Sequence, residues 1–173
     1  MPQLRWRTRG TAAPPARPVG DLSGFGKAGG TSRRLSLDGM TSRTASCSCG
    51  QLRIRVDGEP RGVGLCHCLA CQQRTGSVFA ALASFTAPFE VIGTASEYVR
   101  TGDQGASFTF RFCPVCGSNV FHTEVGNDKR VSVAVGAFAD PGFTAPKVSV
   151  YDCRRHAWVQ LPPGTRAFDR DPP

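Results

Sequence analysis

The chain has 173 residues and a formal net charge of +8, a length that suits one domain and is short for two. No segment approaches the roughly 18 consecutive apolar residues of a membrane-spanning helix, which argues against a membrane protein. The positive charge is concentrated in residues 1–39, where seven Lys or Arg stand against two Asp, so residues 40–173 carry only +3. Such a nearly balanced domain argues against nucleic-acid binding by the core.

Residues 1–39 are rich in Gly and Pro and show almost no periodic apolar pattern. Such a segment cannot bury enough surface to offset its ordering entropy, so we expect a disordered, basic N-terminal extension. Three explanations of this segment are possible: a flexible tail, a targeting segment, or a stretch upstream of a true start at Met40. The last is favoured, because prolines disfavour a targeting helix. The first residues lack the apolar stretch of a secretory signal, which predicts a cytoplasmic location with reduced cysteines.

From Met40 onward, apolar and polar residues alternate in short segments, which is typical of half-buried strands. The strands predicted from this pattern are 52–56, 78–85, 97–100, 108–112, 131–135 and 147–151. No long helical pattern and no internal repeat stand out. The sequence therefore predicts a single, mainly β and mostly antiparallel domain over residues 40–173.

Seven of the eight cysteines fall into three clusters. These are Cys47-Ser48-Cys49, Cys66-His67-Cys68-Leu69-Ala70-Cys71 and Cys113-Pro114-Val115-Cys116. In the last cluster, two intervening residues let both sulfurs point at one ion, Pro114 fixes one backbone angle, and Gly117 permits the left-handed conformation that closes a zinc knuckle. This spacing is a strong zinc pattern.

A closed tetrahedral site around Cys113 and Cys116 needs a second pair of thiolates. Cys47 and Cys49 are the better candidates, because this cluster has two ligands to give and none left over. Residues i and i+2 of an extended strand face the same side, so we expect their sulfurs to converge on one ion. We therefore expect these four cysteines to hold a structural zinc that clamps distant segments together. Loss of one ligand should unfold the domain.

The middle cluster then has three thiolates, Cys66, Cys68 and Cys71, and an open position, which is the arrangement of catalytic zinc. Three other residues could close the site, namely Cys153, His122 and His156. Cys153 is otherwise expected to be a small packed residue. His67 is expected to turn away from the metal, either to face solvent or to support one of the metal ligands. Disulfides are an alternative, but a bridge across one residue is geometrically awkward.

The order and spacing of the three clusters resemble the glutathione-dependent formaldehyde-activating enzyme family, which shares its domain with centromere protein V. Arg74-Thr75-Gly76-Ser77 and His156-Ala157-Trp158-Val159 also look like the family, so the resemblance covers about residues 44–162. It implies a β-tent fold and two zinc ions, one at Cys47, Cys49, Cys113 and Cys116 and one at Cys66, Cys68 and Cys71. The implied reaction joins glutathione and formaldehyde to give S-hydroxymethylglutathione. The reverse direction, in which the carbon–sulfur bond breaks, gives the enzyme class, carbon–sulfur lyase.

The open zinc position predicts chemistry on thiols and aldehydes. Either a zinc-bound thiolate adds to formaldehyde, or zinc polarises the carbonyl oxygen while a neighbouring thiolate attacks. Glutathione carries two carboxylates, so we expect positively charged residues at the rim of its binding site. Arg74 is the first candidate, and Arg154 and Arg155 come second. Two alternatives remain open. The substrates could be another thiol or another aldehyde, or the domain could be a non-catalytic zinc-binding interaction module.

Overall fold

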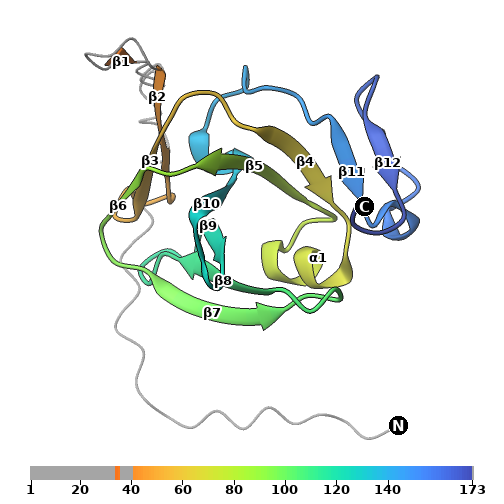
Figure 1. The fold of residues 1–173 in the computed structure, drawn as a ribbon, viewed down its shortest axis with the longest axis horizontal. Helices are drawn as coiled ribbons and strands as arrows, with labels where there is room; N and C mark the ends of the chain where they lie inside the picture. Colours follow the sequence, from red (N-terminus) through yellow and green to blue (C-terminus); the bar gives the residue numbers. More distant parts are fainter. Residues whose placement is uncertain (1–33, 36–40, 173) are drawn as a thin grey trace, which may run out of the picture. The chain divides into compact units, whose positions relative to one another are not determined.

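The described part of the chain consists of residues 34–35 and 41–172 of a computed structural model (Figure 1). Every element below belongs to one unit, Thr31–Pro173. The prediction of a disordered extension over residues 1–39 lies outside the described residues, except for Arg34 and Leu35, which pair with Ser42 and Thr41.

The secondary structure is mainly β, as predicted, and the strands form two sheets. The four-stranded sheet has the order β1 (Arg34–Leu35), β2 (Thr41–Ser46), β3 (Arg53–Asp57), β6 (Phe89–Ile92). The eight-stranded sheet has the order β12 (Arg166–Phe168), β11 (Val148–Val150), β4 (Gly62–Cys66), β5 (Ala80–Thr86), β10 (Asn127–Ala134), β9 (Asn119–Glu124), β8 (Ser107–Phe112), β7 (Ser96–Thr101). The helices are α1 (Leu69–Thr75), η2 (Val135–Phe138) and η3 (Asp152–Arg154). Neighbouring strands run antiparallel, except that β11 is parallel to β4 and β12.

The six predicted strands correspond to β3, β5, β7, β8, β10 and β11. Strands β1, β2, β4, β6, β9 and β12 were not predicted. β4 has two glycines among its five residues, and β9 begins with Asn and ends with Glu. Such residues disfavour strands in isolation, so the tertiary pairing of these segments decides their structure.

The hydrophobic core contains residues of both sheets. Leu52, Ile54 and Val56 are fully buried while Arg53 and Arg55 are exposed, which is the alternation expected of a strand with one face in the core. On the eight-stranded sheet, the buried members of this core are Val63, Ala83, Phe85, Val120, Phe121, Val131 and Val133. Burial of each large apolar side chain stabilises the fold by about 1.5–3 kcal/mol.

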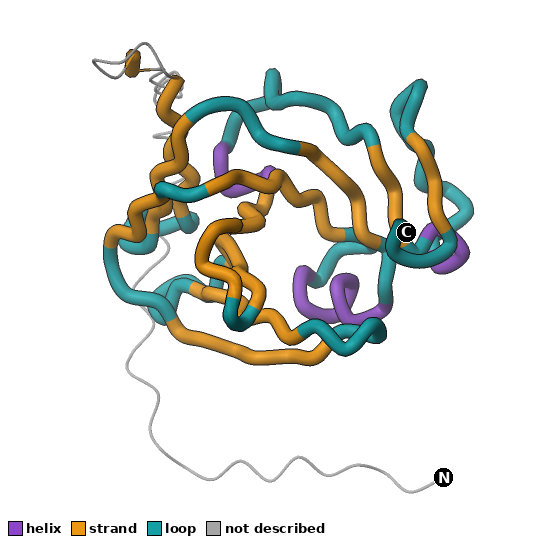
Figure 2. The backbone as a smooth tube through the Cα atoms, viewed as in Figure 1, coloured by secondary structure: helices purple, strands orange, loops and turns teal. Residues whose placement is uncertain are grey.

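The opposite face of the eight-stranded sheet carries small or polar residues on β4, β5 and β10, and aromatic residues on β8. Register places Gly62, Ser84, Ser132, His122 and Phe110 in one row across five strands. The sheet curves so that α1 lies between β4 and β8 (Figures 1 and 2). This curved face and α1 position the functional groups described next.

Candidate metal centres and active site

The first cysteine site joins two turns that are far apart in the sequence. Cys47 and Cys49 follow β2, and Cys113 and Cys116 follow β8. Their four sulfur atoms lie within 4.8 Å of one another, at 3.5 Å for Cys47 and Cys49 and 3.6 Å for Cys49 and Cys113. Four sulfurs bound to one zinc at about 2.3 Å lie about 3.8 Å apart in a tetrahedron, so this donor set fits zinc.

The local backbone corrects one step of the sequence argument. Cys47 and Cys49 lie in a turn rather than on an extended strand, and the Gly50 N–H donates to the Cys47 carbonyl at 3.0 Å. Gly117 adopts the predicted left-handed conformation, with φ of 72°, and its N–H donates to the Cys113 carbonyl at 2.9 Å. Two tight turns, and not strand alternation, therefore bring the sulfurs together.

Hydrogen-bond donors surround the sulfurs of the first site. The Leu52 N–H donates to Cys47 Sγ at 3.2 Å, and Gln51 Nε2 lies 3.5 Å from Cys113 Sγ. Donors of this kind favour the thiolate form that a metal requires. Gln51 is itself held in place, because Nε2 donates to the Thr94 carbonyl at 2.9 Å.

The second cysteine cluster lies where β4 ends and α1 begins. Cys66 ends β4, Cys68 is the N-cap of α1, and Cys71 lies in the first turn of that helix. Cys68 Sγ accepts the Cys71 N–H at 3.3 Å, so the cap that starts the helix also places two of the sulfurs side by side. All three sulfurs lie within 4.8 Å of one another.

These three thiols are too close to ionise independently. The pKa of Cys66 is raised because its thiol is hydrogen-bonded to Cys68, and the pKa of Cys68 is lowered by the same hydrogen bond. Without a metal ion, the three thiols therefore titrate as a coupled group, in which Cys68 loses its proton more readily than Cys66. A divalent cation would neutralise all three sulfurs, so the cluster fits a metal with three protein ligands and one further coordination position.

A cavity of about 210 Å³ opens beside Cys66, Cys68 and Cys71. Its apolar lining includes Leu82, Phe108, Phe110 and Val150. Its charged and polar lining includes Arg100, Asp103, Gln104, His122, Tyr151 and Asp171. A small molecule in the cavity therefore reaches the second cluster, while the sulfurs of the first site do not line this cavity. Apolar walls with a few convergent polar groups are typical of ligand sites.

His122 lines this cavity from β9. Its ring centroid lies 4.8 Å from that of Phe110 and 5.7 Å from that of Phe108. Burial, together with the smaller effect of the Arg74 and Arg100 charges, lowers the pKa of His122 to about 3, so the imidazole is neutral at pH 7. The sequence named His122 only as an alternative fourth ligand, and its nitrogens do not belong to the group of ligand atoms within 4.8 Å of one another.

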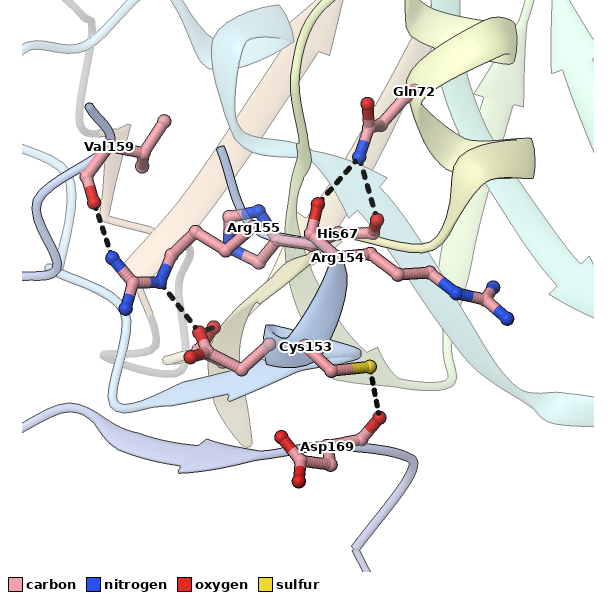
Figure 3. Close-up of polar contacts among 9 residues, drawn as sticks. His67, Gln72, Cys153, Arg154, Arg155, Val159 and Asp169 are labelled. Carbon is pink, nitrogen blue, oxygen red and sulfur yellow. Dashed lines mark hydrogen bonds and ion pairs between the residues drawn. The ribbon is translucent and has the colours of Figure 1, made fainter. Parts of the chain in front are cut away.

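Two other alternative ligands, Cys153 and His156, also lie outside that group of described ligand atoms. Cys153 is exposed, and its thiol donates to the Asp169 carbonyl at 3.3 Å (Figure 3), so the expectation that it is packed is wrong. His156 Nε2 lies 3.1 Å from Gln72 Oε1. All eight cysteines lie in the described residues and are free thiols, which differs from the disulfide alternative.

His67 faces the protein interior although it separates two residues of the second cluster. Its side chain is fully buried and packs edge-on against Phe79, with ring centroids 5.6 Å apart. The solvent-facing position considered from the sequence is therefore wrong. Burial lowers the pKa of His67, which keeps the ring neutral.

The three arginines predicted to contact substrate have protein partners instead of lining the cavity beside the second cluster. The Arg74 guanidinium donates to Asn119 Oδ1, lies 3.7 Å from Cys71 Sγ and covers the Phe110 ring at 4.5 Å.

Arg154 and Arg155 lie on η3 and at its end. Arg155 binds Asp152 at 3.0 Å and the Val159 carbonyl at 2.6 Å (Figure 3). Arg154 lies 3.8 Å from Asp103, a residue that does line the cavity. Arg154 is therefore next to the cavity wall, whereas Arg155 holds a surface turn.

Residues 42–154 match the family described as glutathione-dependent formaldehyde-activating enzyme. The chain belongs to this family. The match covers both cysteine sites and confirms the resemblance seen in the sequence. It supports a glutathione-dependent, formaldehyde-activating type of function at the level of the family.

Other comparisons add little to the family match. A comparison with curated proteins finds no match. A crystal structure of a Rhodobacter sphaeroides protein is similar at 24% identity and a TM-score of 0.43, with 58% of this chain and 90% of that chain covered. Similarity of this degree carries no functional argument. None of the helices in the described residues is long and apolar enough to cross a membrane.

Proposed function

We propose that the chain is a zinc-dependent carbon–sulfur lyase of the S-(hydroxymethyl)glutathione synthase type, acting on glutathione and formaldehyde in the cytoplasm. Family membership supports the type of reaction. The observation that carries the proposal is the difference between the two cysteine sites: four sulfurs form one group, and three sulfurs line a cavity. A related thiol or aldehyde would use the same cavity.

The proposed roles follow from this difference. The structural zinc ligands are Cys47, Cys49, Cys113 and Cys116. The ligands at the catalytic position are Cys66, Cys68 and Cys71. Each chain would then hold two zinc ions, of which only the second has a coordination position that substrate can occupy.

In the proposed reaction, the glutathione sulfur adds to the formaldehyde carbon. A carbon–sulfur bond forms, the carbonyl π bond breaks, and the thiol proton ends on the oxygen, so no oxidant or reductant is required. Zinc held by the second cluster would lower the pKa of a bound thiol or polarise the carbonyl. Phe108 and Phe110 give the cavity apolar walls, and apolar surroundings strengthen electrostatic interactions at the cluster. The neutral imidazole of His122 offers a hydrogen bond to the oxygen that gains the proton.

Arg100 is our first candidate for a glutathione carboxylate. It lines the cavity, and no acidic side chain in the described residues forms an ion pair with it. Arg74, Arg154 and Arg155 remain predicted contacts, but their present partners would have to be exchanged for a carboxylate. The sequence did not single out Arg100, because no cysteine or other chemical motif lies beside it.

The proposed activity is tested by NMR exchange between formaldehyde and its glutathione adduct, because thiols add to formaldehyde without help. Zinc-loaded protein should accelerate exchange above the spontaneous rate, and a Cys66→Ser variant should not. Zinc content and circular dichroism of the variant would show whether it keeps its fold and the first metal ion. Exchange at the spontaneous rate with folded, fully loaded wild-type protein would contradict the proposed activity and leave an interaction module as the better explanation.

A further inference from the structure

A second, larger cavity continues from the candidate active site. Its volume is about 570 Å³, and it shares Cys66, Leu82, Val150 and Asp171 with the smaller cavity. Four shared wall residues mean that the two spaces adjoin beside Cys66. The addition of a thiol to formaldehyde requires only the smaller space, so the larger one is available for another part of the substrate.

The larger cavity lies on the face of the sheet opposite to the core. Gly62 pairs with Ser84, Ser84 pairs with Ser132, and all three line the cavity. Their strand neighbours Ala83 and Val133 are buried in the core. Because side chains alternate along a strand, this face is covered by small, polar groups that leave room for a ligand.

Two arginines line the larger cavity. Arg61 precedes β4 and Arg130 lies on β10; both are exposed, and neither forms an ion pair with an acidic group of the described residues. Arg130 Nη2 lies 3.5 Å from Ser84 Oγ, which directs the guanidinium over the cavity. Asp171 lines the part shared with the smaller cavity, and Glu124 lines another adjoining cavity together with Arg130. The end at Arg61 is therefore cationic.

The length of β4 separates this cationic end from the cysteine cluster. Five residues from Gly62 to Cys66 span roughly 16 Å at about 3.3 Å per residue. In a tripeptide such as glutathione the thiol is on the central residue, so a terminal carboxylate extends roughly 7 Å from that residue. The γ-linked glutamyl arm is longer by its extra methylene groups, and the long side chain of Arg61 can reach back along the cavity to cover the remaining distance. A thiol the size of one amino acid is too short to contact both ends.

We propose that Arg61 and Arg130 form a carboxylate-binding subsite for the distal end of an elongated peptide thiol whose sulfur lies at the Cys66, Cys68, Cys71 cluster. The inference rests on the proposed function, and it narrows the substrate class to thiols of about tripeptide length with a terminal carboxylate. Cysteine and small neutral thiols reach the cluster but not the subsite. Guanidinium groups suit this role because they bind carboxylates in a bidentate manner.

Calorimetric titration of the zinc-loaded chain with glutathione and with cysteine, without formaldehyde, tests the subsite. The Arg61→Gln/Arg130→Gln double variant should bind glutathione at least about tenfold more weakly, because charge-assisted hydrogen bonds are lost. Its affinity for cysteine should not change. Lys129→Gln is the matched control, because it removes a neighbouring charge of β10 that does not line the cavity.

Three results would overturn the subsite: unchanged glutathione affinity in the double variant, an equal loss of affinity for both thiols, or no binding of glutathione by the wild type. Circular dichroism and zinc content of each variant would establish that it is folded and loaded. If the double variant does not fold, Arg61→Gln and Arg130→Gln are titrated singly, with the same expected selectivity. The titration contains no formaldehyde and measures binding alone. A lack of turnover in the exchange experiment would therefore contradict the proposed activity but would not affect this test of the subsite.

Discussion

Cys49 and Cys113 are 64 residues apart in the sequence, and their sulfur atoms lie 3.6 Å apart. Cys49 follows a strand of the four-stranded sheet, and Cys113 follows a strand of the eight-stranded sheet. The first cysteine site therefore connects the two sheets at one point. A metal ion there would close a long loop, and structural zinc contributes on the order of 10 kcal/mol to folding in small domains.

A Cys113→Ser variant should lose the first metal ion and unfold. The expected loss of folding free energy is comparable to the whole free energy of unfolding of a typical domain, about 5–15 kcal/mol. Thermal unfolding followed by circular dichroism, together with native mass spectrometry, would measure both effects. Cys153→Ser is the control, because Cys153 is exposed and lies outside both clusters; it should keep both ions and a near-native Tm. A folded Cys113→Ser protein would show that the first site is not a structural clamp.

A Cys68→Ser variant should remain folded and lose one zinc equivalent and thiol turnover. Serine is a good N-cap, so α1 keeps the cap that Cys68 provides, while the second site loses one ligand. Native mass spectrometry would count the metal ions, and adduct exchange would report activity. Global unfolding of this variant would instead favour a non-catalytic module in which both ions are structural.

An Arg100→Gln variant should raise the KM for glutathione by about tenfold, since one charge-assisted hydrogen bond to a carboxylate is lost. The rate with 2-mercaptoethanol, which has no carboxylate, should stay close to wild type. Arg53→Gln is the control, because Arg53 is an exposed residue of the other sheet. Equal effects of Arg100→Gln on both thiols would exclude carboxylate binding by this residue.

A Gly93→Ala variant should lose about 1–3 kcal/mol of folding free energy, because overpacking forces the backbone to move. A Cβ at Gly93 would lie 1.9 Å from the Gln51 carbonyl oxygen, and Gln51 contacts Cys113 of the first site. Gly126→Ala is the control: φ is also positive there, but a Cβ meets no atom within 4 Å. Denaturant unfolding should show a larger loss for Gly93→Ala, and equal losses would mean that backbone conformation alone is responsible.

Stability should fall with decreasing pH because of His122. Its pKa is about 3 in the folded chain and about 6.5 when unfolded, so only the unfolded state binds a proton between these values. The free energy of unfolding should therefore decrease by up to about 1.4 kcal/mol for each pH unit as the pH falls from 6 to 4. A His122→Gln variant should show a shallower decrease in denaturant unfolding at matched zinc content. Parallel curves for variant and wild type would contradict a neutral, buried imidazole.

The grouping of the cysteines could be predicted from the sequence because spacing limits which sulfurs can share an ion. The two-residue spacing of Cys113 and Cys116 is typical of a zinc knuckle, and the two remaining clusters differ in the number of thiolates that they offer. The strand geometry predicted for Cys47 and Cys49 was wrong, since a turn brings them together. The grouping still agrees with the structure, because short loops limit sulfur–sulfur distances whatever their conformation.

The cavity could not be predicted, because its walls come from strands that are distant in the sequence. Arg100, His122 and Asp171 carry no local motif, and they line one cavity only because β7, β9 and the segment after β12 reach the same region. Arg74 illustrates the opposite case. It lies close to the cluster in the sequence, and the fold directs its guanidinium to Asn119 and Phe110.

The sequence alone therefore determined the mainly β class, the family and the partition of seven cysteines into two groups, because alternation and motif spacing are local properties of the chain. Only the tertiary structure decided which charged side chains line the cavity beside Cys66 and that a larger, cationic cavity adjoins it. Sheet register and curvature set those positions, and both depend on packing between residues that no local pattern relates.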